Sequence, residues 1–181
     1  LITKLLQNNV ALITCDEKRM PIGLMLNLDG HHMQQELFAN QLNASVPLKK
    51  QLWQQTIKAK IFNQYSLLKS IIGFDKTNSN DFENMLYWNY EARAAAFYWG
   101  MIFSSSINEF KRGREEPFPN PLLNYGYAIL RAVTARSLVA SGMLPTFGIH
   151  HHNKYNAYAL ADDIMEPYRP FVDRIVRQLV I

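Results

Sequence analysis

The sequence predicts a mainly α-helical domain preceded by a short β-containing segment. Two long stretches, residues 48–72 and 122–139, carry apolar side chains at helical spacing, and each has start and stop signals at its ends. Strand character is confined to residues 10–26. Because 48% of the 181 residues are hydrophobic, the chain can bury a core, which excludes an intrinsically disordered protein.

The β-containing segment comes first. Residues 2–9 have the pattern of the end of a helix, and the short apolar runs 10–15 and 22–26 predict two strands. We expect Cys15 to be a small buried side chain at the end of a strand. The chain begins without a methionine and stops inside an amphipathic pattern, so we expect both ends to be cut.

Composition limits the class of protein. A single cysteine excludes an intrachain disulfide framework and fits a reducing cytoplasm. The longest apolar run, residues 94–103, is too short to span a bilayer, so we expect no membrane association. A net charge of +4 fits an anionic partner such as nucleic acid, although ordinary basic proteins share it.

The first long helix is expected to begin at Ser45, an N-cap residue, with Pro47 in its first turn, and to end at Gly73. Its apolar face consists of Leu48, Leu52, Ile57, Ile61, Tyr65, Leu68 and Ile72. Its other face carries Lys49, Lys50, Lys58, Lys60 and Lys69. We expect that lysine face to be solvated, and phosphate contact is the alternative.

A second helix is expected over residues 81–103, with Glu91 among aromatic residues and alanines. A carboxylate in such surroundings is costly to bury unless a cation or hydrogen bonds satisfy it. Two interpretations of Glu91 therefore stay open: a cation-binding acid, or an exposed glutamate paired with Arg93 or Arg112.

Two further helices follow. Asn120-Pro121 starts the third helix, which Gly142 ends. Gly126 lies inside it at a cost of about 1 kcal/mol relative to alanine, so we expect close packing there. A last helix is expected from near Tyr158, with an interruption around Pro167 and Pro170.

Histidines and acids cluster before and within that last helix. They are His150, His151, His152, Asp162, Asp163 and Glu166. Because the helix is amphipathic, we expect its three acids to be neither all exposed nor all buried. Three adjacent histidines cannot all ligate one ion from a loop, so one of them is the expected ligand. A site of mixed His and carboxylate ligands suits Mn²⁺ or Mg²⁺. A surface histidine run beside an ordinary acidic helix is the alternative.

Four motifs in order carry a family resemblance. They are Tyr90-Glu-Ala-Arg-Ala-Ala95, Leu123-Asn-Tyr-Gly-Tyr-Ala-Ile-Leu-Arg131, Ala140-Ser-Gly-Met-Leu-Pro-Thr-Phe-Gly148 and Leu160-Ala-Asp-Asp-Ile-Met-Glu-Pro-Tyr-Arg-Pro170. From about residue 3 to its end, the chain resembles the CRISPR-associated spacer integrase, the endonuclease/integrase subunit of CRISPR adaptation. The branch that works beside a single large effector nuclease is the most similar.

The resemblance implies a metal-dependent DNA enzyme with the ligands Glu91, His151 and Glu166 around Mg²⁺ or Mn²⁺. Asp163 matches a family acid close to the site. Asn124, Tyr125 and Tyr127 belong to a family pattern near the site, and helix packing is their other interpretation. Phosphate contact is one interpretation of four cationic residues, and surface charge or local salt bridges is the other. These four are Arg131, Arg136, Lys154 and Arg169.

The implied reaction is attack by a DNA 3′-hydroxyl on a phosphodiester at the edge of the repeat array, which inserts a new spacer. The implied partners are double-stranded DNA (prespacer and CRISPR repeat), a second copy in a homodimer, and a small partner subunit. Since family members have an N-terminal β-rich domain, we expect residues 1–28 to be its remnant and linker, and residues 29–181 to be the α-helical catalytic domain. Two alternatives are an unrelated metal-dependent nuclease and a catalytically silent DNA-binding or assembly module.

Overall fold

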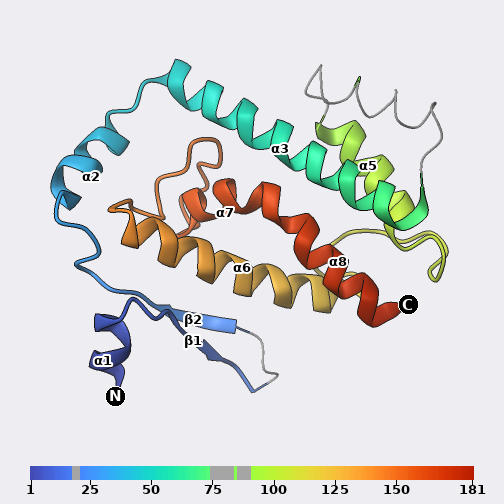
Figure 1. The fold of residues 1–181 in the computed structure, drawn as a ribbon, viewed down its shortest axis with the longest axis horizontal. Coiled ribbons are helices and arrows are strands. Elements are labelled where there is room, and N and C mark those ends of the chain that lie inside the picture. Colours follow the sequence, from blue (N-terminus) through green and yellow to red (C-terminus); the bar gives the residue numbers. More distant parts are fainter. Residues whose placement is uncertain (18–20, 74–83, 85–90) are drawn as a thin grey trace. The chain divides into compact units, whose positions relative to one another are not determined.

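The computed structural model describes residues 1–17, 21–73, 84 and 91–181, and these residues are mainly helical, as the sequence predicts (Figure 1). In chain order the elements are α1 (Ile2–Gln7), β1 (Leu12–Cys15), β2 (Pro21–Met25), α2 (Gln34–Leu42), α3 (Val46–Ile72), α5 (Glu91–Ile102), α6 (Asn120–Ala140), α7 (Ala159–Met165), the 3₁₀ turn η1 (Glu166–Tyr168) and α8 (Arg169–Val180). None of the helices in this described part combines the length and apolar character that a bilayer crossing requires.

The chain divides into two compact units. Unit 1 comprises Leu1–Trp53 and Tyr127–Met165, and unit 2 comprises Gln54–Gly126 and Glu166–Ile181. The chain passes from one unit to the other within α3, within α6 and between α7 and η1. The expected division into residues 1–28 and 29–181 stays a prediction.

The strands of unit 1 form an antiparallel pair, in which Leu12 lies opposite Met25 and the register shifts between Thr14 and Cys15. The pair of strands was expected, but the prediction of a buried Cys15 is wrong, because this side chain is exposed. Within the described residues the sheet has only these two strands.

In unit 1, α2 also holds the loop that precedes the histidines. Gln41 donates a hydrogen bond from its side-chain amide to the Leu144 carbonyl, and it accepts one from the Leu144 N–H, both at 2.8 Å. Leu160 N–H then donates to the Pro145 carbonyl at 2.9 Å, which ties the loop to the start of α7. The backbone on either side of the histidines is therefore anchored.

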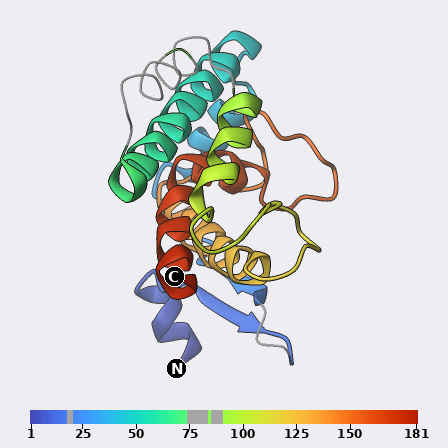
Figure 2. The same cartoon turned by 90° about the vertical axis from the view of Figure 1, so that its right-hand side faces the viewer.

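The expected ends of α3 are confirmed. The Leu48 N–H lies 3.4 Å from Ser45 Oγ at the start, and Gly73 follows the last residue with a φ of 65°. Only the middle of the predicted apolar face is deeply buried, through Ile57, Ile61 and Leu68. In unit 2, α5 lies beside the C-terminal part of α3 (Figure 1, Figure 2). The expected first half of the α5 helix lies outside the described residues.

A buried polar contact links α5 with α8 in unit 2. Tyr98 is fully buried, and its hydroxyl donates a 2.7 Å hydrogen bond to Asp173 Oδ2. Arg177 Nε donates to the Ile102 carbonyl at 3.0 Å. The expected interruption near the two prolines is confirmed, because η1 separates α7 from α8. The two contacts between α5 and α8 therefore hold the helix that follows Glu166 and η1 in place.

The close packing expected at Gly126 is confirmed. A Cβ atom there would lie 2.4 Å from Val172 Cγ1 of α8. We expect Gly126→Ala to lower the free energy of unfolding by about 1–3 kcal/mol, because overpacking outweighs the roughly 1 kcal/mol gain in helix propensity. Gly100 of α5 is the matched control, because nothing lies within 4 Å of its added Cβ. Urea unfolding should show that Gly100→Ala does not destabilise, and equal effects of the two substitutions would contradict this packing.

Candidate active site

Three side chains of unit 2 meet through a single ammonium group. Lys60 of α3 places its Nζ atom 2.8 Å from Glu91 Oε1, at the start of α5, and 2.7 Å from Glu166 Oε2, on η1. The Lys60 side chain is only 13% exposed. The expectation that Lys60 lies on a solvated face is therefore wrong. The acids that cover this part of α3 come from distant positions in the chain, so periodicity along the helix could not reveal them.

Glu166 is a buried carboxylate between two cationic groups. Its Oε1 atom lies 2.9 Å from Arg169 Nη2, one turn further along the chain. Its Oε2 atom is buried and has no hydrogen bond of good geometry within the described residues, so its contact there is the ion pair with Lys60. The Lys60 ammonium offsets the cost of burying this charged oxygen. Such an atom is suited to binding a cation.

Glu91 is more open than Glu166, with 38% of its side chain exposed. The ion pair that the structure describes for it is with Lys60, not with Arg93 or Arg112. Arg112 donates instead to Asn120 Oδ1 at 2.9 Å and to Asn124 Oδ1 at 2.8 Å. Asn124 thus helps to order the loop before α6, and its family-implied role near the site stays a prediction.

In unit 1, Asp163 anchors the histidine loop. Its carboxylate is fully buried, and its Oδ2 atom accepts backbone N–H groups from Ile149 at 2.7 Å and from His150 at 2.8 Å. The His151 N–H lies 3.4 Å from both carboxylate oxygens, and His151 Nδ1 forms a short contact with Oδ1. Because Nδ1 faces Asp163, Nε2 is the ring nitrogen of His151 that a cation could bind.

Trp53 and Gly148 shape the same loop. The Trp53 ring stacks on His150 with centroids 4.1 Å apart and planes 4° apart, and it meets the His151 ring edge-on at 5.6 Å. A Cβ atom at Gly148 would lie 2.5 Å from the His151 carbonyl oxygen and 2.8 Å from Asp163 Oδ2. The loop therefore closes too tightly for a side chain at position 148. The sequence interpretation missed both residues, although a glycine just before a histidine run was a usable signal.

Asp162 has a separate partner in unit 1. Arg131 Nε lies 2.6 Å from its Oδ1, Arg131 Nη2 lies 3.1 Å from its Oδ2, and Asn156 donates to Oδ2 at 2.7 Å. Asp162, Asp163 and Glu166 are all buried, so the expectation of mixed exposure is wrong. Each acid has its own cationic or N–H partners, which offset the cost of removing the carboxylates from water.

Each of the four cationic residues that had two interpretations makes a local contact. Arg131 pairs with Asp162, and Arg169 pairs with Glu166. Arg136 donates to the Asn9 carbonyl at 2.8 Å, and Lys154 Nζ lies 4.9 Å from the centre of the Tyr155 ring. The local interpretation is therefore favoured for Arg131 and Arg169, whose carboxylate partners are buried, and Lys154 keeps an exposed position.

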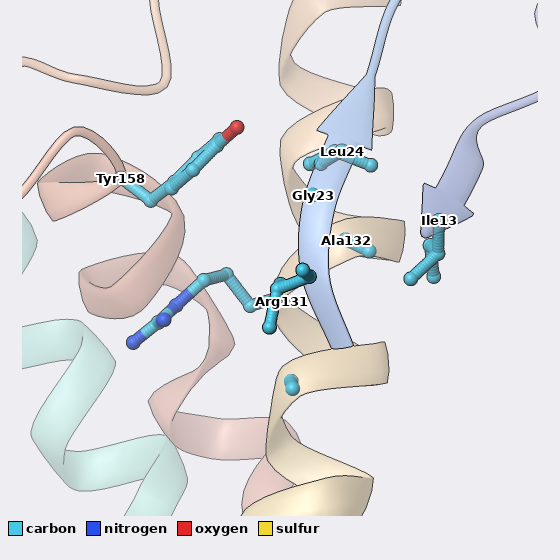
Figure 3. Close-up of a pocket in the computed structure, with 8 residues that line it drawn as sticks. Ile13, Gly23, Leu24, Arg131, Ala132 and Tyr158 are labelled. Carbon is cyan, nitrogen blue, oxygen red and sulfur yellow. The ribbon is translucent and has the colours of Figure 1, made fainter. Parts of the chain in front are cut away.

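Unit 1 also contains a pocket of about 110 Å³ (Figure 3). It is lined by Ile13, Ile22, Gly23 and Leu24 of the hairpin, by Ala128, Arg131 and Ala132 of α6, and by Tyr158. These lining residues include Arg131 but no carboxylate, although Arg131 pairs with Asp162.

The structure brings two of the three predicted ligands together, since Glu91 and Glu166 share one ammonium group in unit 2. His151 is in unit 1 with Asp163. Within the described ranges, no three His, Cys, Asp or Glu side chains gather closely enough to hold a metal ion. The three-ligand metal site stays a prediction.

The fold defines the class of protein first. The chain superposes on a solved casposase bound to integration product with a TM-score of 0.75 and 22% identity, covering 99% of this chain and 56% of that one. A solved Cas6-RT-Cas1–Cas2 complex gives a TM-score of 0.75 and 24% identity, covering 99% of this chain and 22% of that one. This helical domain therefore has the fold found in casposase and Cas1 structures.

The sequence then assigns the family. The family model for CRISPR associated protein Cas1 matches residues 77–181, so the chain belongs to the Cas1 family, and the resemblance seen in its motifs is confirmed. The CRISPR-associated endonuclease Cas1 of Neisseria meningitidis serogroup C is 38% identical over 99% of this chain. The chain spans 59% of the length of that relative. A Cas1 endonuclease of Pyrobaculum aerophilum is 39% identical over 49% of this chain and 30% of its own length.

Proposed function

We propose that the protein is a metal-dependent DNA endonuclease and integrase of CRISPR adaptation, in which a DNA 3′-hydroxyl attacks a phosphodiester of the repeat array. The convergence of Glu91 and Glu166 on one ammonium group carries this proposal, because two carboxylates aimed at a single positive charge can instead bind a divalent ion. Family membership supports it, as do a relative named an endonuclease and a neighbour bound to an integration product.

Glu91, Glu166 and His151 are the proposed ligands for Mg²⁺ or Mn²⁺. The residues fit such an ion in two respects. Glu166 Oε2 is a buried hard oxygen that already contacts a cationic group, the Lys60 ammonium, and Asp163 fixes the His151 ring so that Nε2 remains for a ligand bond. A bound ion would supply positive charge at the scissile phosphate and lower the cost of deprotonating the attacking hydroxyl.

The neighbouring side chains position these ligands. The Asp163 carboxylate accepts hydrogen bonds from backbone N–H groups of the histidine loop, and it sets the orientation of the His151 ring. Arg169 holds Glu166 Oε1, so Oε2 is directed toward the Glu91 side of the cluster. The protein needs no nucleophilic side chain for this reaction, because the DNA end supplies the hydroxyl.

The partners are part of the same proposal. We place double-stranded DNA at the acid site, and we expect a second copy of the chain and a small partner subunit in the active assembly. A solved neighbour is a complex that contains both Cas1 and Cas2, which supports a Cas partner. The net charge of +4 favours DNA as a substrate.

The experiment that tests this function is joining of a labelled duplex with free 3′-hydroxyl ends to a supercoiled repeat plasmid in Mn²⁺. We expect Glu166→Gln to reduce joining by at least about a hundredfold, because the amide cannot replace an anionic ligand. Glu115→Gln is the matched control, since this glutamate side chain is 94% exposed. We expect it to join DNA like the unsubstituted protein.

Two outcomes would contradict the proposed function. Joining by folded Glu166→Gln at the unsubstituted rate would exclude Glu166 as a ligand. DNA binding without any joining, unchanged when Glu91 and Glu166 are both replaced by glutamine, would instead indicate a catalytically silent DNA-binding module.

A further inference from the structure

The Lys60 ammonium occupies the place between the two carboxylates of the proposed cation site. It lies 2.8 Å from Glu91 Oε1 and 2.7 Å from Glu166 Oε2, both ordinary ion-pair distances. Lys60 comes from the middle of α3, and its side chain is mostly buried. Its charged end is thus held on the acids and not in solvent.

Among the described residues, the ion-paired groups of this cluster balance one another in charge. Glu91 and Glu166 contribute two negative charges, and Lys60 and Arg169 contribute two positive ones. Adding a dication without moving a cationic side chain would leave two surplus positive charges in a largely buried place. Desolvation makes such a surplus costly.

Lys60 lies close enough to the proposed ligand oxygens to repel a divalent ion bound to them. An ion bound directly to Glu166 Oε2 would lie about 2.1 Å from that oxygen, and therefore within about 5 Å of Lys60 Nζ in its present position. Arg169 contacts Oε1, the other oxygen of Glu166. Lys60 contacts one oxygen of each of the two carboxylates that are proposed to bind the ion.

We infer that Lys60 is a resident counter-ion of this site: its ammonium holds Glu91 and Glu166 together in the cation-free protein and swings away when a divalent ion binds. The inference rests on the proposed function. Lys60 is therefore a positioning residue that stabilises the empty acid pair and weakens cation binding by competing for the same oxygens. The other lysine of this helix turn, Lys58, is exposed and has no such role.

Mn²⁺ affinity is the first test, measured by electron paramagnetic resonance of free Mn²⁺ with the purified protein and no DNA. We expect Lys60→Gln to bind Mn²⁺ at least about tenfold more tightly, because the competing charge is gone. Lys58→Gln removes the same charge from the same helix, and we expect its affinity to stay within about twofold of the unsubstituted protein. Equal or weaker binding by Lys60→Gln would overturn the inference.

Amine labelling is the second test, and it needs no substitution at Lys60. The unsubstituted protein is treated briefly with acetic anhydride, with and without saturating Mn²⁺, and each lysine is quantified by mass spectrometry. We expect acetylation of Lys60 to rise at least about threefold in Mn²⁺ as its ammonium leaves the acids, whereas that of Lys58 stays constant. Labelling of Lys60 that stays constant or falls would show that Lys60 remains in place, which overturns the inference even if Lys60→Gln binds Mn²⁺ more tightly.

Glu91→Gln separates failure of this inference from failure of the proposed function. If Glu91→Gln loses Mn²⁺ binding but Lys60 and Lys58 give the same results in the affinity and acetylation tests, the cation site stands and the role of Lys60 is wrong. If Glu91→Gln and Glu166→Gln both bind Mn²⁺ like the unsubstituted protein, the proposed site itself is wrong and the role of Lys60 falls with it.

Discussion

His151→Ala is expected to abolish DNA joining, with a loss of at least about a hundredfold, while the protein stays folded. The side chain supplies a proposed ligand through Nε2, and alanine offers no replacement for it. The fold should survive, because Asp163 still accepts the backbone N–H groups of Ile149 and His150, and the His151 side chain is 48% exposed. Plasmid joining in Mn²⁺ and a thermal melt measure the two effects separately.

His152→Ala is the matched control, because His152 is adjacent and exposed and is not an implied ligand. It should join DNA at the unsubstituted rate. If His152→Ala loses activity and folded His151→Ala keeps it, the assignment of the ligand within the histidine run is wrong.

Asp163→Ala is expected to lower the free energy of unfolding by about 3–5 kcal/mol. The carboxylate is fully buried, so alanine leaves the backbone N–H groups of Ile149 and His150 without their acceptor and removes the partner of His151 Nδ1. Asp163→Asn should cost less, because the amide oxygen still accepts hydrogen bonds. Urea unfolding measures both values.

Asp29→Asn is the control, because Asp29 is an exposed aspartate. We expect this substitution to change the free energy of unfolding by no more than about 0.5 kcal/mol. A loss below about 1 kcal/mol in Asp163→Ala would contradict the role of this carboxylate as the anchor of the loop. Restoration of stability without restoration of joining in Asp163→Asn would show that the charge also serves the orientation of His151.

Local signals predicted the helices well. Ser45 and Gly73 mark the ends of α3 because capping and positive φ depend on residues next to one another in the chain. The close packing at Gly126 was also predictable, since a glycine that lowers helix propensity indicates that another element approaches closely. These features need no knowledge of tertiary contacts.

The electrostatic partners could not be predicted in the same way. Lys60 has the spacing of a solvated lysine, and its two acids are far away in sequence. The burial of Asp162 depends on Arg131, and that of Asp163 depends on the folded loop. A pattern along one helix reports which residues share a face, but it does not report which charges another element brings to that face.

The most direct measurement of the proposed cation site is the anomalous scattering of Mn²⁺ in crystals of the protein soaked with MnCl₂. We predict one anomalous peak at ligand distance from Glu91 Oε1 and Glu166 Oε2, with His151 Nε2 as the third protein ligand and Lys60 Nζ withdrawn from both acids. A peak only at other residues, with Lys60 still between Glu91 and Glu166 at saturating Mn²⁺, would contradict the site.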